Sequence, residues 1–333
     1  MKKFDVYAVG NALVDFEVEV SEQQLEQLKI EKGIMTLIDA ERHHVLMGHL
    51  EGTRHNRACG GSAANSIIAL SQLGGKSFYS CRVADDEAGD FFLNDLQSHG
   101  VEINQNSHRP ESVTGKCIVM VTPDADRTMN TYLGVTGELG RDVLDKEAIK
   151  NSKYLYIEGY LSSAPLALEA ACEAKKVAEE NQVKVAFTLS DPSMVRFFRE
   201  GIDTLIGKGV DMLFCNEDEA LEYTGQVTLE QAIPLLKQIA KTFVITLGEK
   251  GSMICDGEKE IVISAEKVDA IDTNGAGDMF AGAFLYMLCQ GHDFELAGQL
   301  ANFASAKVVQ KFGPRLNAEE AIPVQKFAGE LTH

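Results

Sequence analysis

The segment Asp272-Thr273-Asn274-Gly275-Ala276-Gly277-Asp278 holds the residue types best suited to chemistry, and it runs directly into an apolar stretch at 279–289. That stretch predicts a buried helix beginning near Asp278. Small residues at 275–277 leave backbone N–H groups uncovered at the helix N-terminus, where unpaired donors and the helix dipole favour an anion. A phosphoryl group bound there would lie beside Asp278, which could accept a proton from an attacking hydroxyl. The alternative is a glycine-rich turn in which Asp278 only complements the helix dipole.

Two common nucleotide-binding motifs are missing. A P-loop needs a glycine five residues before its Gly-Lys-Ser, but Gly75-Lys76-Ser77 has Leu70 at that position. No G-x-G-x-x-G opens a helix after a strand, which argues against a dinucleotide-dependent dehydrogenase. The segment at 272–278 is therefore the strongest candidate for an anion site.

Several motifs together resemble those of the ribokinase-like (PfkB-type) carbohydrate and nucleoside kinases. The segment at 272–278 is similar to the C-terminal signature of that family, and the resemblance extends from about Gly10 to Gly313. Several motifs in the right order are harder to obtain by chance than any one of them. The other motifs are Gly60-Gly61-Ser62-Ala63-Ala64-Asn65, which resembles the Gly-Gly motif, Asn216-Glu217-Asp218-Glu219, which resembles the N-x-x-E element, and Thr246-Leu247-Gly248-Glu249-Lys250-Gly251, which resembles the nucleotide loop.

The resemblance implies a role for each part of the signature. Asp278 would be the catalytic base, and the amides of Gly275, Ala276 and Gly277 would form an anion hole for the phosphoryl charge. In the family a monovalent cation lies behind the anion hole, partly held by the residue that matches Asp272. The resemblance therefore implies K⁺ as an activator.

The resemblance also implies sites for ATP and Mg²⁺. Asn216 and Glu219 would orient water molecules around Mg²⁺, although this spacing also makes a helix capping box, and both interpretations can hold together. Thr246 and Gly248 would contact the ATP phosphates at the end of a buried strand. Asn302 corresponds to residues near the adenine of ATP, or is a polar residue on a helix surface.

The acceptor site resembles that of adenosine kinases more than that of ribokinase or fructokinase. Asn11 and Asp15 match residues that bind ribose hydroxyls, and a carboxylate that accepts from adjacent hydroxyls suits a cis-diol. Arg127 would be a lid cation that reaches the transferred phosphoryl group, or else a solvated turn residue. Met35 and Leu37 would wall the base pocket, or only pack. The remaining residues expected at the acceptor are Gly60, Gly61, Ser62 and Asn65.

Adenosine is therefore the expected acceptor, with inosine or guanosine second and a free sugar such as ribose or fructose third. Adenosine kinases carry a Phe-Phe pair where this chain has Tyr160-Leu161, so Tyr160 or Tyr132 would have to supply the aromatic face for the base. An inactive nucleoside sensor or a structural protein are further alternatives. The presence of Asp278 between intact phosphate-handling motifs argues against both.

Alternating strands and helices must position these residues. Apolar runs at 4–10, 153–159, 183–189, 210–215 and 243–248 predict strands, and periodic patterns at 62–73, 87–99, 165–181, 229–241 and 278–289 predict helices. The alternation predicts a doubly wound α/β fold, with a mostly parallel sheet covered by helices on both faces. Residues 11–38 and 104–135 instead predict antiparallel strands in a small sheet that forms a lid. We expect residues 1–333 to form one kinase domain with this lid.

Composition limits the partners. The 333 residues carry 31 basic and 50 acidic side chains, for a net charge of −19, which repels nucleic acid and anionic membranes. The seven cysteines show no C-x-x-C pair and no metal-ligand spacing, as expected for reduced thiols. The longest apolar stretch is too short to span a bilayer. We expect a cytoplasmic protein whose partners are ATP and a small nucleoside or sugar.

Overall fold

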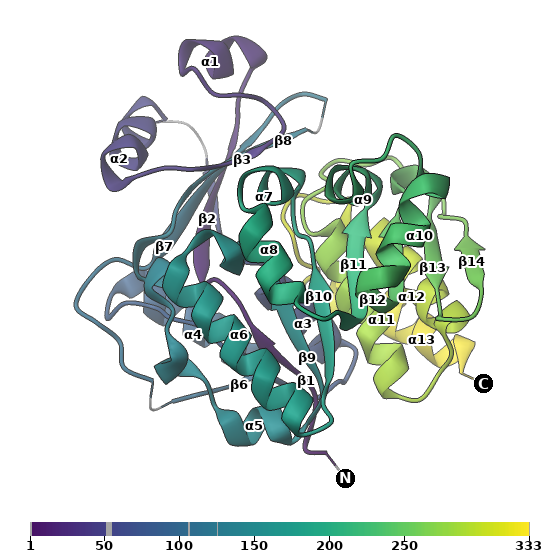
Figure 1. Cartoon of the computed structure of the whole chain (residues 1–333). Coiled ribbons are helices and arrows are strands. Elements are labelled where there is room, and N and C mark those ends of the chain that lie inside the picture. The colour runs from purple at the N-terminus through teal and green to yellow at the C-terminus, as the bar shows by residue number, and fades with distance from the viewer. Residues whose placement is uncertain (1, 51–54, 106, 125, 333) are drawn as a thin grey trace.

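The computed structural model describes residues 2–50, 55–105, 107–124 and 126–332. Its strands form two sheets, one of nine strands and one of five. The large sheet runs through the body of the molecule, and the small sheet projects from one side of that body together with two short helices (Figure 1). A large, mostly parallel sheet with a smaller second sheet confirms the predicted fold class.

The large sheet has the strand order β14-β13-β12-β11-β10-β9-β1-β5-β6. Every neighbouring pair from β6 to β12 is parallel, whereas β13 and β14 add antiparallel strands at the other edge. All five predicted strands are present, with shifted ends. The strands are β1 (Phe4–Val9), β5 (Ser77–Ser80), β6 (Glu102–Ile103), β9 (Ser152–Glu158), β10 (Lys184–Thr188), β11 (Val210–Asn216), β12 (Ala240–Thr246), β13 (Ser252–Cys255) and β14 (Glu260–Ile263).

Helices cover both faces of the large sheet, and each face has its own hydrophobic core. Along β1, Tyr7 and Val9 belong to one core, and Val6 and Ala8 belong to the other. The first core packs on α5 (Lys146–Lys150), α6 (Pro165–Glu180), α7 (Pro192–Phe197), α8 (Arg199–Ile206), α9 (Glu217–Thr224) and α10 (Leu229–Ile239). The second packs on α3 (Ser62–Gln72), α4 (Glu87–Ser98), α11 (Ala276–Cys289), α12 (Phe294–Val308) and α13 (Ala318–Leu331). In the described part of the chain, no helix is long and apolar enough to cross a membrane.

Two helix ends differ from the expected positions by two residues, and the other differences are of one residue. The helix predicted over 229–241 ends at Ile239, because Ala240 already pairs with Val210 as the first residue of β12. Helix α11 begins at Ala276 and not at Asp278, because Gly275 adopts a left-handed backbone (φ 74°) and serves as its N-cap. Asp278 therefore lies in the first helical turn, as predicted.

The small sheet has the strand order β3-β8-β7-β2-β4. Its strands are β2 (Leu13–Glu19), β3 (Met35–Leu37), β4 (His55–Cys59), β7 (Gly115–Val121) and β8 (Arg127–Tyr132). Helices α1 (Glu22–Gln27) and α2 (Ala40–His49) pack on it through a third core that includes Val18, Leu25, Leu46, Ile118 and Met120. Both segments expected in the small sheet, 11–38 and 104–135, contribute strands to it.

The expectation of antiparallel strands was correct only in part, because strands of the segment 11–38 pair with strands of the segment 104–135 in parallel. Strands β2 and β7 are parallel neighbours, and so are β3 and β8, whereas β2–β4 and β7–β8 are antiparallel. Between β2 and β7 the chain returns to the large sheet and builds α3, β5, α4 and β6. A connection of that length allows the chain to re-enter the small sheet in the same direction, which a short hairpin cannot do.

Candidate active site

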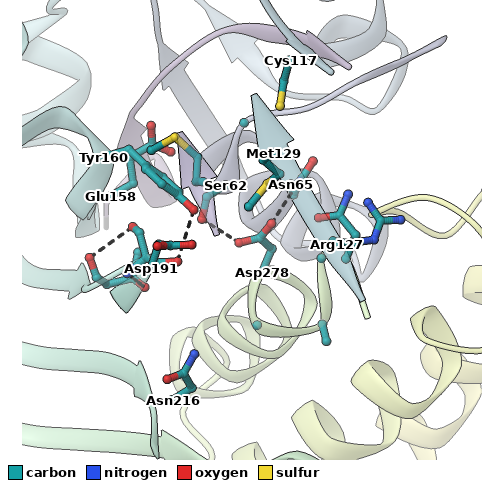
Figure 2. A pocket seen from close by; sticks show the side chains of 18 of the residues that line it. Ser62, Asn65, Cys117, Arg127, Met129, Glu158, Tyr160, Asp191, Asn216 and Asp278 are labelled. Carbon is teal, nitrogen blue, oxygen red and sulfur yellow. Dashed lines mark hydrogen bonds between the residues drawn. The ribbon is translucent and has the colours of Figure 1, made fainter. Parts of the chain in front are cut away.

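A cavity of about 460 Å³ lies between the carboxyl ends of the parallel strands and the small sheet. The last residues of four adjacent strands line it, namely Glu158, Thr188, Asn216 and Thr246. Ligands of open α/β sheets collect at this edge. Figure 2 shows side chains from the large sheet, from α3 and α11 and from the small sheet pointing into this space.

Most of the predicted site residues line this one cavity. They are Asn11, Asp15, Met35, Leu37, Gly61, Ser62, Asn65, Arg127, Asn216, Glu219, Thr246, Gly248, Gly275, Ala276, Gly277 and Asp278. Gly60, Asp272 and Asn302 are outside the lining. Residues more than 200 positions apart in the sequence therefore meet at one edge of the sheet.

The Asp278 carboxylate is held in a fixed orientation. Ser62 Oγ donates to one of its oxygens (2.6 Å) and Asn65 Nδ2 donates to the other (2.8 Å), as Figure 2 shows. Both donors lie in the first turns of α3, which packs directly against α11. Burial raises the pKa of Asp278, and these two hydrogen bonds and the charge of Arg315 oppose the rise. A half-buried, oriented carboxylate of this kind can serve as a general base.

The turn before α11 is shaped by glycine. A Cβ on Gly275 would lie 2.2 Å from the carbonyl oxygen of Pro314, so no larger residue fits there. A Cβ on Gly277 would meet nothing within 4 Å, because this residue faces the open cavity. The Ala276 N–H donates to the Thr273 carbonyl (3.3 Å), so this amide already has a partner within the turn.

Arg127 and Asp272 form a buried ion pair between the small sheet and this turn. Arg127 donates to both Asp272 oxygens through Nε and Nη2, and Asp272 also accepts from the backbone N–H of Asn274 (2.9 Å) and Gly313 (2.8 Å). Four N–H donors and a guanidinium charge already satisfy this carboxylate. Asp272 does not fit the expected role of ligand to a monovalent cation. Arg127 itself lines the cavity, and its Nη1 has no hydrogen-bond partner among the described residues.

Asp15 lies on β2 and lines the cavity from the small sheet. Its side chain is 6% exposed, and no hydrogen bond reaches the carboxylate from the described residues. A Cβ on Gly60 would lie 2.1–2.3 Å from the three atoms of this carboxyl group, so the predicted Gly60 serves by leaving room for Asp15. Burial raises the pKa of Asp15 to about 7, and the neighbouring Glu17 contributes to the rise. The Asp15 carboxylate can therefore accept hydrogen bonds from a bound ligand.

Glu158 is a site residue that sequence reasoning missed. It ends β9 and is fully buried, and its carboxylate accepts from the backbone N–H of Asn11 (2.7 Å) and of Ala63 (2.7 Å). Burial raises its pKa to about 7. Glu158 therefore ties the start of the small sheet to the start of α3. The signal available in the sequence was an acidic residue at the end of an otherwise apolar strand, directly before Gly159.

The opposite end of the cavity carries the residues expected to bind ATP. Asn216 and Glu219 form the capping box of α9, with Asn216 Oδ1 accepting from the Glu219 N–H (2.7 Å) and Glu219 Oε2 accepting from the Asn216 N–H (3.1 Å). Burial raises the pKa of Glu219 to about 8. Asn302 does not reach the cavity, because its amide donates to the Ile263 carbonyl of β14 (3.0 Å). It is nevertheless buried, unlike a residue on a helix surface.

One side of the cavity is apolar. Met35, Leu37, Met129 and Leu133 come from the small sheet and its exit. Tyr160, which follows β9 of the large sheet, lines the same cavity, and all five side chains belong to or pack against the first hydrophobic core. The Tyr160 hydroxyl donates to the Ser190 carbonyl (3.3 Å). Of the two tyrosines considered from the sequence, Tyr160 lines the cavity, whereas Tyr132 lies outside it beside His43.

Comparison with known proteins gives consistent matches over nearly the whole chain. The model of the pfkB family of carbohydrate kinases matches residues 29–321. Adenosine kinase from Saccharomyces cerevisiae is 25% identical over 94% of this chain and 96% of its own length. Ribokinase from Staphylococcus aureus is 29% identical over 82% of this chain and 87% of its own length. The crystal structure of adenosine kinase from Sinorhizobium meliloti superposes with a TM-score of 0.92 and is 34% identical, covering 97% of this chain and 99% of that one.

Proposed function

The chain belongs to the pfkB family of carbohydrate kinases, and from this premise we propose that it transfers the terminal phosphoryl group of ATP to the 5′-hydroxyl of adenosine. Its relatives are named adenosine kinase and ribokinase, which are ATP-dependent phosphotransferases, so the chain is an ATP-dependent kinase of a nucleoside or sugar hydroxyl. The choice of adenosine within that class is our proposal.

The apolar side of the cavity is the observation that favours a nucleoside. The thioethers of Met35 and Met129 and the ring of Tyr160 line the same cavity as Asp15, so a ribose bound at Asp15 would direct its base toward them. A purine would cover these apolar surfaces and stack on an aromatic face. A free sugar would leave the same surfaces in contact with water, and that apolar area would contribute nothing to its binding.

Asp278 is the proposed base. Its carboxylate would accept the proton of the acceptor hydroxyl as that oxygen attacks the terminal phosphorus of ATP, and the departing ADP would carry away the electrons of the broken P–O bond. Ser62 and Asn65 keep the carboxylate aimed at the cavity. In the turn that opens α11, the amides of Gly275 and Gly277 would lie beside the charge that develops on the phosphoryl oxygens, whereas the Ala276 amide donates to the Thr273 carbonyl.

The arrangement also suits Mg²⁺ bound to the ATP phosphates. Glu219 is a buried carboxylate that lines the cavity, and its oxygens accept hydrogen bonds from the backbone and side-chain nitrogens of Asn216. Together with Asn216 it would orient water molecules of a hydrated Mg²⁺. The metal would supply charge neutralisation at the phosphates. Arg127, which lines the cavity, would add a positive charge near the transferred group.

We further propose that the whole chain is one kinase unit and that its small sheet acts as a lid. The chain passes between the two sheets at residues 10–12, at 60–61, between β6 and β7, and at 133–134, and both sheets line the cavity. Closure over a bound acceptor would exclude water from the reacting phosphoryl group. Lid closure would thereby favour transfer of the phosphoryl group to the acceptor over hydrolysis of ATP.

A sugar acceptor is the second candidate, because the ribokinase relative matches over 82% of this chain and Asp15 could equally bind the hydroxyls of a free sugar. Thermal unfolding with single additions of adenosine, inosine, guanosine, ribose and fructose separates the candidates, since a ligand that binds only the folded state raises the unfolding temperature. We expect adenosine to give the largest increase. A larger increase with ribose or fructose would contradict the adenosine assignment and support the sugar candidate.

A further inference from the structure

The C-terminal segment Gly313-Pro314-Arg315 contacts three parts of the site, although it lies outside the cavity lining. The Gly313 N–H donates to Asp272 Oδ2 (2.8 Å), and the backbone of Pro314 closes the space beside Gly275. Arg315 reaches the opposite helix, α3, where its Nε donates to Asn65 Oδ1 (2.6 Å). This segment thus joins the turn before α11 to the helix that orients the base.

From this geometry we propose that Arg315 is a positioning residue for phosphoryl transfer, which fixes the Asn65 amide so that its N–H donors face the Asp278 carboxylate. The proposal rests on the role assigned to Asp278 above. Arginine carries donors only, so the end of Asn65 that faces Arg315 must be the carbonyl oxygen. The amide nitrogen is then necessarily the end that faces Asp278, to which it donates at 2.8 Å.

Arg315 is itself held rigidly. Its Nη1 pairs with Asp95 of α4, and its Nη2 donates to the Gly60 carbonyl (3.3 Å), so all three nitrogens are occupied. Gly60 is also the residue that makes room for the Asp15 carboxylate. The side chain is only 12% exposed. A partly buried arginine with every nitrogen engaged is preorganised, so it orders its partners at little further entropic cost.

Without Arg315, the Asn65 amide would be free to rotate. Its carbonyl oxygen could then face Asp278, and the carboxylate would lose a donor and its fixed orientation. A base displaced by about 1 Å can cost about 100-fold in rate even when binding is intact. The expected signature is therefore a fall in kcat with little change in the affinity for ATP or acceptor.

The test compares Arg315→Ala with Arg82→Ala. Arg82 is a matched control, because its side chain is 9% exposed, it pairs with Asp142, and it does not line the cavity. We expect Arg315→Ala to lower kcat by roughly 10- to 100-fold while the KM values for ATP and acceptor change less than about threefold. Arg82→Ala should lose stability with kcat unchanged. A kcat for Arg315→Ala within twofold of the native value would overturn the proposal.

Two further variants keep the test decisive. In an Asn65→Ala background, Arg315→Ala should add little further loss, because Arg315 acts through Asn65. Additive losses of kcat in the double variant would contradict an effect of Arg315 that runs through Asn65. If Arg315→Ala does not fold, Asp95→Ala replaces it, since Asp95 anchors Arg315 from outside the cavity. A normal kcat for Asp95→Ala would then count against the proposal. Failure of the Asp278 assignment would show separately, as an active Asp278→Asn enzyme.

Discussion

A carboxylate that accepts a proton from an alcohol must be ionised, aimed and close to the reacting oxygen. The hydrogen bonds from Ser62 and Asn65 aim the Asp278 carboxylate. Asp278→Asn keeps the size of the side chain but removes its basicity. We expect kcat to fall by about 10²–10⁴, as for other general bases, with ATP affinity nearly unchanged. Steady-state kinetics and calorimetric titration of ATP check both quantities, and near-native turnover would refute the role of Asp278.

Asp15 predicts a pH dependence of acceptor binding. Burial raises its pKa to about 7, so the carboxyl group is increasingly neutral as the pH falls below 7. A neutral carboxyl group is a weaker acceptor for the two ribose hydroxyls. KM for adenosine should therefore rise as the pH is lowered from about 8 to 6, whereas Asp15→Asn should show a high KM that varies less with pH. A native KM that is constant over this range would contradict the prediction.

The same residue predicts discrimination against deoxynucleosides. An acceptor that lacks one ribose hydroxyl leaves a buried carboxylate partly unpaired, and sites built around a substrate hydroxyl reject such analogues by roughly 10⁴-fold. We expect 2′-deoxyadenosine and 3′-deoxyadenosine to be poor substrates of the native enzyme. Asp15→Ala should lower the rate with adenosine much more than the rates with these analogues. Equal losses for all three would mean that Asp15 only supports its strand.

Sequence reasoning succeeded for residues whose partners lie close to them in the chain. Asp278 follows its glycine-rich turn directly, and Asn216 and Glu219 are one helical turn apart, so their neighbours could be inferred from spacing. Glu158 and Arg315 could not be found in this way. Glu158 acts on Asn11 and Ala63, and Arg315 acts on a residue 250 positions away. Only the packing of α3 against α11 and β9 brings these groups together.

Among the elements, the turn before α11 gives the sharpest contrast. Gly275→Ala would force a Cβ against Pro314 at a positive φ, so we expect a large loss of stability together with activity. Gly277→Ala meets no atom and gains about 1 kcal/mol of helix propensity, so the protein should be no less stable. Its added methyl group would enter the cavity where the phosphoryl group is proposed to bind. Thermal unfolding and kcat should therefore separate the two variants, and equal losses of stability in both would contradict this account.

The apolar pattern predicted the strands of the large sheet but not the direction of strand pairing in the small sheet. Alternation of apolar strands and helices was enough to predict the large sheet, because each strand of a parallel sheet must be followed by a crossover. The direction of pairing in the small sheet was not predictable from alternation, since β2 and β7 carry the same period whether parallel or antiparallel. It depends on the intervening excursion through α3, β5, α4 and β6.

For the whole molecule, the proposed lid makes a prediction about dynamics. Adenosine together with a non-hydrolysable ATP analogue should slow amide hydrogen exchange in β3 and β8 of the small sheet, because closure protects these strands. Strands β9 and β10 of the large sheet serve as the internal control and should change little. Unchanged exchange in β3 and β8 at saturating ligand would contradict lid closure.

The proposed preference for adenosine is measured directly by kcat/KM for adenosine, inosine, guanosine, ribose and fructose under one set of conditions with saturating ATP. Adenosine should have the highest value, and it should clearly exceed ribose and fructose, because a purine covers the apolar side formed by Met35, Met129 and Tyr160 while its ribose binds Asp15. The value for ribose should be lower by at least about 10²-fold, the effect of roughly 3 kcal/mol of lost apolar contact. A kcat/KM for ribose or fructose equal to or above that for adenosine would contradict the account.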